Sequence, residues 1–383
     1  MSPNHSTEIV IIGGGVIGLS VARALALRGV RDICLVEKED LGTEASFAAA
    51  GMLAPQVEAD ADDEFFKLAC RSRDMYVDFA ARLLEETDVN VELDTTGTIY
   101  IALTEADALD CEKRFSWQTT AGFDVEKLSA NEVLSIEPLI NPSVKLALFF
   151  PRDIQVENRR LICALANSVN KLGVQILSHT RSDEIRTENN KVVGVETSQG
   201  FISCNTVVIA AGCWSGQVRI IGSRLRHGPT MEPVRGQMVC FAAKPKLSRH
   251  VVYSHRGYIV PRQDGRLLAG STSEPGTFVK QTTAGGVASI LKNATEISPQ
   301  IAQLPIIDMW AGLRPKALDG LPVFGPCDEI AGLHYATGHY RNGILLAPVT
   351  GELIAQAILE PAKSADLAPF SPNRFSQATV GNN

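Results

Sequence analysis

The sequence has few of the features that mark a secreted, membrane-bound or nucleic-acid-binding protein. Its eight cysteines are scattered, without a Cys-x-x-Cys pair or a cluster with histidine, so we expect reduced thiols and no bound metal. No apolar run approaches the roughly 20 residues of a membrane-spanning helix, and Ile9–Ile12 is too short for a signal-peptide core. The net charge of −7 argues against a polyanion-binding surface. These absences predict a cytoplasmic protein that binds neither membranes nor nucleic acid.

The length and composition favour a two-domain globular protein. The 383 residues exceed what one hydrophobic core usually serves. Apolar residues make up 45% of the chain and charged residues 21%, which excludes disorder as the main state. The 31 glycines are distributed unevenly, and their positions carry much of the functional signal.

A glycine-rich loop lies between an apolar strand pattern and a helical pattern at the start of the chain. Glu8–Ile12 predicts a buried parallel strand, Gly13-x-Gly15-x-x-Gly18 follows at once, and the next apolar residues recur at helical spacing. A second predicted strand, Ile33–Val36, ends in Glu37. This order is typical of a unit that binds a dinucleotide, with its pyrophosphate on the loop and a ribose on the acid. A glycine turn without a ligand is the alternative.

A stretch poor in bulky side chains follows, from Thr43 to Leu53. Such a backbone can press against a flat ring or a diphosphate, with Ser46 and backbone amides as donors. A tightly packed helix contact made of alanines is the alternative interpretation.

Four segments together resemble one family. The glycine loop with Glu37, and Ala48-Ala49-Ala50-Gly51-Met52-Leu53, resemble the D-amino-acid oxidase superfamily of FAD-dependent amine oxidoreductases, most closely its glycine-oxidising members. Two C-terminal motifs, Trp310–Pro315 and Gly338–Pro348, are narrower signals of the same resemblance, which covers nearly the whole chain.

The pattern of elements and the resemblance together predict an α/β fold. We expect a discontinuous, Rossmann-like FAD-binding domain and an α+β substrate domain built on a large, mostly antiparallel sheet. The expected FAD-binding segments are residues 1–86, 143–222 and 318–370, the substrate-binding segments are 87–142 and 223–317, and 371–383 form a C-terminal tail. Helices are expected over residues 63–86, 131–138, 159–172, 283–297 and 346–359.

The resemblance implies FAD held without a covalent bond. Related sarcosine oxidases attach their flavin to a cysteine in the stretch that corresponds to Pro315–Gly325, where this chain has none. The residues expected to contact FAD are Gly13, Gly15, Val16, Ile17, Gly18, Glu37, Lys38, Ala45, Ser46, Ala50, Gly51, Met52, Ser182, His339, Tyr340, Arg341, Asn342, Gly343, Ile344 and Leu345.

Three residues are candidates for holding the substrate. Arg314 lies between a glycine that permits close approach and a proline expected to stiffen a turn, and its guanidinium can donate two parallel hydrogen bonds to a carboxylate. Arg341 precedes the last predicted helix and is expected to serve substrate as well as flavin. By resemblance, Tyr258 presents its hydroxyl to the bound carboxylate. The alternatives are a structural arginine, a plain Arg-Asn-Gly turn and an ordinary sheet tyrosine.

The resemblance implies oxidation of a small amino acid. Glycine or sarcosine would give glyoxylate with ammonia or methylamine, oxygen would be reduced to hydrogen peroxide, and the product would serve thiazole formation for thiamine. No catalytic base stands out; His255 and His339 are the nearby candidates, and hydride transfer to FAD needs none. The rivals are a D-amino-acid or proline dehydrogenase that reduces a quinone or a partner protein, and a flavin-binding subunit without its own activity. We also expect a homo-oligomer.

Overall fold

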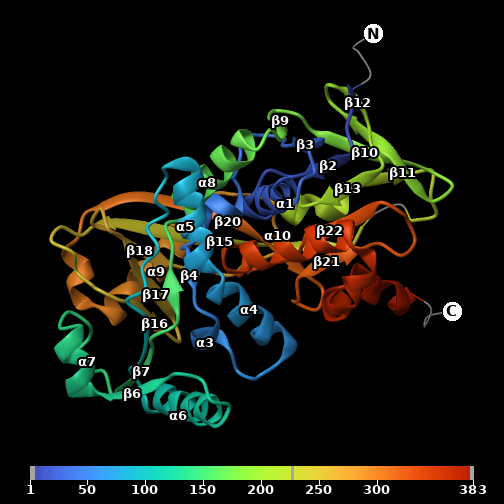
Figure 1. Cartoon of the computed structure of the whole chain (residues 1–383). Coiled ribbons are helices and arrows are strands. Elements are labelled where there is room, and N and C mark those ends of the chain that lie inside the picture. Colours follow the sequence, from blue (N-terminus) through green and yellow to red (C-terminus); the bar gives the residue numbers. More distant parts are fainter. Residues whose placement is uncertain (1–4, 226–227, 380–383) are drawn as a thin grey trace.

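The computed structural model describes residues 5–225 and 228–379, and within them two large sheets dominate the molecule (Figure 1). The first has six strands in the order β21, β22, β13, β2, β3, β9. All neighbours are parallel except β21 and β22. The bounds are β21 (Val323–Pro326), β22 (Leu333–Thr337), β13 (Thr206–Ile209), β2 (Ile9–Ile12), β3 (Ile33–Val36) and β9 (Gln175–Leu177).

Both faces of this sheet are covered, which explains the β-branched runs of its central strands β2 and β13. On one face pack α1 (Val16–Leu27), α8 (Asn158–Lys171) and α10 (Gly343–Leu359). A five-stranded sheet covers the other face, in the order β1 (His5–Ser6), β12 (Gly200–Ser203), β11 (Lys191–Thr197), β10 (Ser182–Glu188) and β14 (Arg219–Ile221).

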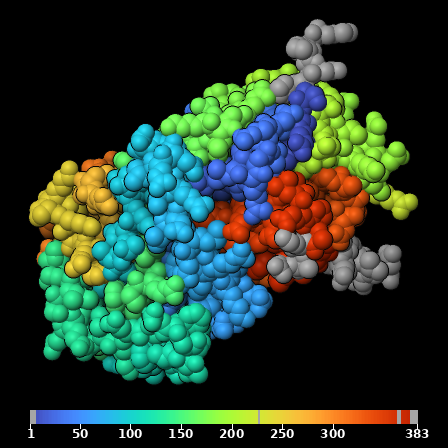
Figure 2. Space-filling view, in the orientation of Figure 1, coloured from blue at the N-terminus to red at the C-terminus, as the bar shows by residue number. Residues whose placement is uncertain are grey.

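The first and last helices of the nucleotide half are in direct contact, although more than 300 residues separate them. In Figure 2 the blue N-terminal surface borders the red C-terminal one. The close approach depends on Gly351 of α10, where an added Cβ would lie 2.7 Å from the carbonyl oxygen of Ser20 in α1. The two ends of the chain therefore share one core.

The second large sheet has nine strands and is mostly antiparallel. Its order is β19, β15, β18, β17, β16, β5, β7, β6, and β20 pairs with the other edge of β15. The bounds are β19 (Glu274–Pro275), β15 (Met231–Ala242), β18 (Arg266–Gly270), β17 (Gly257–Pro261), β16 (Val251–Ser254), β5 (Thr98–Ala102), β7 (Leu146–Phe150), β6 (Glu126–Ser129) and β20 (Ile306–Ala317).

One face of this sheet carries a hydrophobic core under α9 (Ala284–Ile297) and α7 (Ala130–Ile136), and the other face looks toward the nucleotide half. The expected fold class is confirmed: a Rossmann-like parallel sheet is joined to a large, mostly antiparallel one. The division into domains stays a prediction. The sheets place β7 with the substrate half, although residues 143–222 were assigned to the nucleotide half.

The smaller elements lie mostly around the junction of the two halves. They are α2 (Ala45–Ala48), β4 (Met52–Leu53), α3 (Pro55–Glu58), β8 (Ile154–Gln155), the 3-10 helix Gly212–Gln217, and three further 3-10 helices at Pro299–Gln303, Pro361–Phe370 and Pro372–Thr379. Strand β4 pairs with β8 and links the alanine-rich segment to the rest of the molecule.

Several predicted helices differ from the observed ones. The helix expected over 63–86 is two helices, α4 (Glu64–Asp74) and α5 (Tyr76–Thr87), and α10 begins at Gly343 instead of 346. Helix α6 (Glu105–Thr120) was missed because most of its residues are exposed and its apolar face is thin. Its signal was the capping box, in which Thr104 and Asp107 bond each other's backbone amides.

The expected turn at Gly312–Pro315 is wrong, because these residues lie within β20. The long pairing with β15 sets Val234 opposite Arg314 and Gly236 opposite Gly312.

No helix in the described ranges is long and apolar enough to cross a membrane.

His334 on β22 is expected to make the protein less stable in acid. Burial lowers the pKa of His334 to about 4, from 6.5. The unfolded chain therefore binds more protons than the native one below pH 6.5, so stability falls as pH falls. As the pH falls from 8 to 5, this group should lower the free energy of unfolding by about 2 kcal/mol. Urea unfolding of wild type and His334→Gln measures the difference, and equal losses on acidification would contradict it.

Candidate active site

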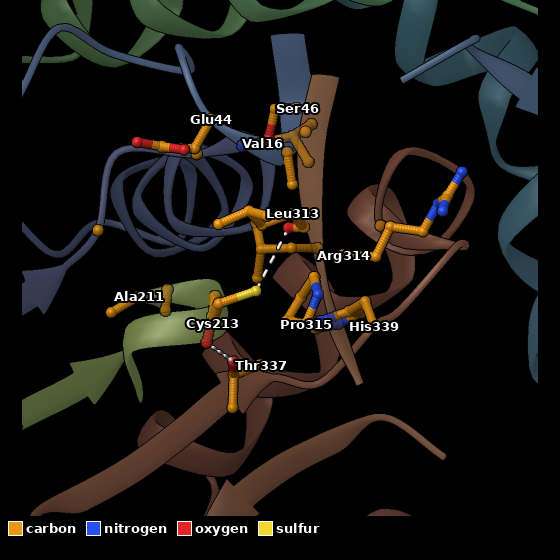
Figure 3. Close-up of a pocket in the computed structure, with 18 of the residues that line it drawn as sticks. Val16, Glu44, Ser46, Ala211, Cys213, Leu313, Arg314, Pro315, Thr337 and His339 are labelled. Carbon is orange, nitrogen blue, oxygen red and sulfur yellow. Dashed lines mark hydrogen bonds between the residues drawn. The ribbon is translucent and has the colours of Figure 1, made fainter. Parts of the chain in front are cut away.

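A cavity of about 440 Å³ lies between the carboxyl end of the six-stranded sheet and the nine-stranded sheet. Figure 3 shows part of its wall: Val16 and Ser46 come from the N-terminal segment, Cys213 from the 3-10 helix after β13, and Leu313 and Arg314 from β20. The carboxyl ends of parallel strands are where open α/β sheets bind their ligands.

The glycine loop at this cavity has a shape that only glycine permits. Gly13 has φ of +111°, and a Cβ there would lie 2.5 Å from the carbonyl oxygen of Ala210. A Cβ on Gly18 would lie 1.9 Å from the carbonyl oxygen of Gly13. Gly18 does not line the cavity itself; it lets α1 pack close to the loop. The loop therefore fits a pyrophosphate-binding turn.

The start of α1 presents hydrogen-bonding groups to the cavity. Gly15 caps the helix without a side chain, and the amide of Val16 donates to Oγ of Ser46 over 3.0 Å. That hydroxyl keeps its own proton for a phosphate oxygen. Elsewhere in the cavity wall, the buried Oγ of Ser182 has no hydrogen-bond partner in the described part of the chain, which suits a site built for a ligand.

Glu37 is held rigidly at the end of β3. Its Oε2 accepts from the amide of Gly14 over 2.7 Å, and its Oε1 accepts from the amide of Glu39 over 3.0 Å. Each carboxylate oxygen retains a free lone pair for a sugar hydroxyl. The next residue, Lys38, has its Nζ 3.4 Å from the ring centre of Trp214. Trp214 also lines the cavity but was not among the residues predicted from the sequence.

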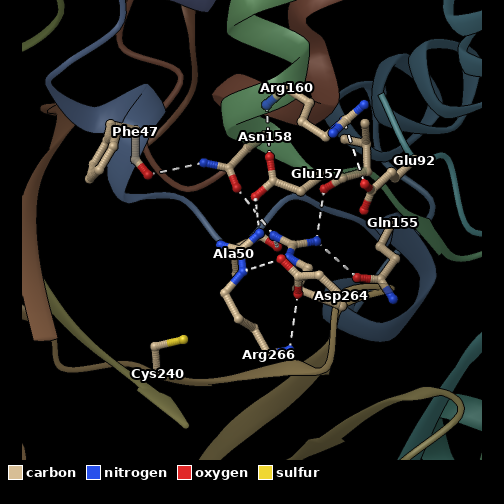
Figure 4. Close-up of polar contacts among 12 residues, drawn as sticks. Phe47, Ala50, Glu92, Gln155, Glu157, Asn158, Arg160, Cys240, Asp264 and Arg266 are labelled. Carbon is tan, nitrogen blue, oxygen red and sulfur yellow. Dashed lines mark hydrogen bonds and ion pairs between the residues drawn. The ribbon is translucent and has the colours of Figure 1, made fainter. Parts of the chain in front are cut away.

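A buried arginine holds the alanine-rich segment in place. Arg262 donates from Nη2 to the carbonyl oxygen of Ala50 (2.8 Å) and Oδ1 of Asn158 (3.1 Å). Its Nη1 donates to the carbonyl oxygen of Val156 (3.0 Å) and Oε1 of Gln155 (3.1 Å). Figure 4 shows three of these acceptor residues, Ala50, Gln155 and Asn158, converging on one point, and the Asn158 amide donates to the carbonyl oxygen of Phe47.

The same segment could not carry a side chain at Gly51. Its φ is +74°, and a Cβ would lie 2.0 Å from the carbonyl oxygen of Val156.

Burial lowers the pKa of Arg262 to about 10, so the guanidinium stays charged at neutral pH.

Arg314 lies in the cavity with neutral partners only. Nη2 donates to Oγ of Ser271 over 2.6 Å and Nη1 to the carbonyl oxygen of Thr272 over 3.0 Å. No carboxylate of the described chain pairs with it. Leu313 and Arg314 project to opposite sides of β20, as strand geometry requires (Figure 3). An uncompensated guanidinium in a cavity is suited to bind an anionic group of a ligand.

Gly236 of β15 provides the surface on which this guanidinium lies. A Cβ there would come within 2.3–2.4 Å of Nη2, Cζ and Nη1 of Arg314. We expect Gly236→Ala to raise KM for the substrate about tenfold or more, because misplacement by about 1 Å can cost that much. Unfolding free energy should change by less than about 1 kcal/mol, since only a flexible side chain must move. Steady-state kinetics and urea unfolding measure both.

Gly285→Ala is the matched control for this substitution. Gly285 is in α9, and a Cβ there would have no heavy atom within 4 Å. Its KM should remain that of the wild type. Equal KM values for Gly236→Ala and Gly285→Ala would show that Gly236 does not position Arg314.

Arg341 is arranged differently from Arg314. Its Nη2 donates to Oε1 of Glu58 and to the hydroxyl of Tyr253, both over 2.7 Å, and that hydroxyl donates to the same Glu58 oxygen over 2.9 Å. The Glu58 carboxylate raises the pKa of Arg341, so the guanidinium stays protonated. The ion pair compensates much of its positive charge. Arg341 and Glu58 both line the cavity.

The two histidines considered as bases lie in different places. His339 lines the cavity but is buried, shares a 3.0 Å contact with Oγ1 of Thr350, and has its pKa lowered to about 3 by burial. It is therefore neutral. His255 lies in a separate cavity with Asp107 and Glu296, so it does not line the cavity at the end of the six-stranded sheet.

The structure brings nearly all residues predicted to bind FAD or substrate to one cavity. The exceptions are Gly18, which packs α1 against the loop, and Leu345, whose side chain is buried in the core and whose carbonyl oxygen accepts from Ser72. Tyr258 is at the wall, with its hydroxyl 3.5 Å from Sδ of Met238. The sequence analysis missed Glu58 and Gly236, because neither lies in a local motif.

Comparisons with known proteins agree with this geometry. The family model described as FAD dependent oxidoreductase matches residues 8–357. The chain belongs to this family. A glycine oxidase from Geobacillus kaustophilus (strain HTA426) is 37% identical over 372 residues, 97% of this chain and 97% of that protein. The crystal structure of glycine oxidase from Geobacillus kaustophilus superposes with a TM-score of 0.91 at 36% identity, covering 97% of this chain and 99% of that one.

A further relative is a longer protein. The bifunctional protein ThiO/ThiG of Trichormus variabilis (strain ATCC 29413 / PCC 7937) is 33% identical over 97% of this chain, which matches 55% of its length. As a member of the FAD-dependent oxidoreductase family, the chain uses FAD, and the glycine loop, the orphaned Ser182 hydroxyl and the fixed Glu37 fit that cofactor.

Proposed function

We propose that the protein oxidises the amine of a small amino acid, glycine or sarcosine, to an imine. Water then converts the imine to glyoxylate and ammonia or methylamine. The observation that carries this proposal is the uncompensated guanidinium of Arg314 in the same cavity as the glycine loop. The glycine oxidase names of the full-length relatives support it.

FAD is proposed to lie along the residues that the sequence analysis selected at the cavity. The pyrophosphate would lie on Gly13, Gly15 and the start of α1, a ribose on Glu37, and the adenine near Ser182. The backbone of Asn342–Ile344, at the N-terminus of α10, would face the ring, where partial positive charge favours a reduced flavin. When bound, FAD supplies the two-electron acceptor for the Cα–H bond.

The protein's part in the reaction is positioning. Arg314 would hold the α-carboxylate through two parallel hydrogen bonds, with Ser271, Thr272 and Gly236 fixing the plane of its guanidinium. Within the described ranges, the hydroxyl of Tyr258 donates to the thioether of Met238, a weak acceptor, so it can donate to the same carboxylate instead. Orientation alone can contribute several orders of magnitude to the rate.

No side chain of the described cavity is assigned as a general base. His339 is neutral but buried against Thr350, and Glu58 is occupied by Arg341 and Tyr253. The substrate would therefore bind with a neutral amine, after its proton has passed to water. This arrangement predicts that kcat/KM rises with pH until the amine of the free amino acid is deprotonated.

We further propose oxygen as the electron acceptor, with release of hydrogen peroxide, rather than a quinone or partner protein. The ThiO/ThiG relative supports a role in supplying thiazole for thiamine. The eight free cysteines suit the cytoplasm. We also propose a homo-oligomer, which gel filtration tests.

The decisive experiment is anaerobic bleaching of the FAD absorbance. Glycine, sarcosine, proline and D-alanine are added in turn, and we expect glycine and sarcosine to bleach the flavin fastest. Admission of air should restore the yellow colour and release one peroxide per amino acid oxidised. A yellow protein that none of the four bleaches would refute the proposed function; bleaching without peroxide in air would indicate a dehydrogenase.

A further inference from the structure

Two of the arginines that line the cavity, Arg314 and Arg341, differ in how their charge is compensated. Arg314 has neutral partners, Ser271 Oγ and the carbonyl oxygen of Thr272. Arg341 is bound to the Glu58 carboxylate over 2.7 Å. Counting these three side chains, the wall offers one net positive charge, enough for one carboxylate of a ligand.

Glu58 is fixed in this position from several sides. It ends α3, whose first turn is anchored by Asp153: the buried carboxylate accepts from the amides of Gln56 (3.2 Å) and Val57 (2.8 Å). Its Oε1 also accepts from the hydroxyl of Tyr253. Glu58 therefore cannot easily rotate away from Arg341 when a ligand enters.

The hydroxyl that joins the pair is also fixed. The Tyr253 ring stacks between Tyr100, with centroids 5.9 Å apart, and Tyr258, with centroids 5.6 Å apart. Arg341 thus donates from one nitrogen to two acceptors that are also hydrogen-bonded to each other. Movement of either Glu58 or Arg341 to admit a second anion would break two of these hydrogen bonds.

We propose that Glu58 is a specificity-determining residue that limits the pocket to amino acids with a single carboxylate. A second carboxylate that reached Arg341 would meet the Glu58 carboxylate and be repelled. Without the charge on Glu58, the Arg341 guanidinium would become a second anion site. This inference rests on the proposed function, because it assumes that Arg314 takes the first carboxylate.

Glu58→Gln tests the proposal, because glutamine keeps the shape and an acceptor oxygen but removes the charge. Acetate and malonate, which are not oxidised, are titrated calorimetrically into the oxidised holoenzyme. We expect the ratio of malonate to acetate affinity to rise at least tenfold in Glu58→Gln. Glu58→Asp, which retains the charge, should leave that ratio within about threefold of the wild type.

The source of any gain is checked with Arg341→Met. In the Glu58→Gln background, Arg341→Met should abolish the added malonate affinity. In the wild-type background it leaves Glu58 uncompensated, and malonate should bind even more weakly relative to acetate. This second variant keeps the test available if Glu58→Gln folds poorly, which FAD absorbance and circular dichroism would show.

Turnover gives an independent readout with two substrates of similar size. N-ethylglycine and iminodiacetate both carry a two-carbon substituent on the amine, but only in iminodiacetate does that substituent end in a carboxylate. Glu58→Gln should raise kcat/KM for iminodiacetate relative to N-ethylglycine at least tenfold. No rise in either ratio, or a wild type that already prefers malonate, would overturn the role of Glu58. Failure of every amino acid to bleach the wild type would instead refute the proposed function.

Discussion

Arg314→Ala is expected to lower kcat/KM for glycine by about two to four orders of magnitude. Removal of one partner from a buried charged pair costs about 3–5 kcal/mol, and each 1.36 kcal/mol is tenfold in rate. Arg314 pairs with no carboxylate of the described chain, so its charge is available to the substrate carboxylate. The substitution would remove that whole interaction. Steady-state peroxide release measures the loss.

Two observations separate a lost carboxylate site from general damage. The variant should retain FAD with an unchanged spectrum, because Arg314 is on β20, away from the glycine loop, and acetate should no longer bind. The kcat/KM of Arg314→Lys should lie between those of the wild type and Arg314→Ala, because lysine keeps the charge but lacks the planar guanidinium. Bleaching of Arg314→Ala at the glycine concentrations that bleach the wild type would contradict the assignment.

Arg262→Met should destabilise the protein by about 3–5 kcal/mol and weaken FAD retention. Four buried acceptors would lose a charged donor, each loss costing about 1–3 kcal/mol without strict additivity. The carbonyl of Ala50 is among them, so the segment that ends in Gly51 would lose its main anchor. Urea unfolding and the FAD that remains after gel filtration measure the two effects.

Arg160→Met is the matched control for the buried arginine. Arg160 lies on the same side of the molecule, but its side chain is 46% exposed and its ion pair with Glu92 is long, 3.5 Å. Such a pair contributes at most about 1 kcal/mol. If Arg262→Met were no less stable than Arg160→Met, the network around Ala50 would not support the cavity.

Local signals made the nucleotide half predictable. The positive φ of Gly13 and the contact of Gly18 with the nearby carbonyl oxygen of Gly13 are local requirements for glycine. The strands Ile9–Ile12 and Thr206–Ile209 are runs of β-branched residues because both faces of their sheet are covered. The same locality explains why Glu37 was placed correctly at the end of its strand.

The residues that shape the substrate side depend on pairings that no local pattern contains. Gly236 meets Arg314, 78 residues further along the chain, only because β15 and β20 pair in one register. Glu58 and Arg341 are 283 residues apart in the sequence, and Arg262 reaches Ala50 over 212. Arg341 was therefore expected to bind the substrate, whereas in the structure its guanidinium forms an ion pair with the Glu58 carboxylate.

The order of strands in the six-stranded sheet has a consequence for how the chain is made. Strand β2 is complete after residue 12, yet its inner neighbour β13 ends at residue 209, and β22 follows only at residue 333. A nascent chain leaving the ribosome therefore carries an unpaired apolar strand edge through most of its synthesis. Such high contact order predicts slow folding that completes after translation, with the early segment exposed to aggregation until the C-terminal helix arrives.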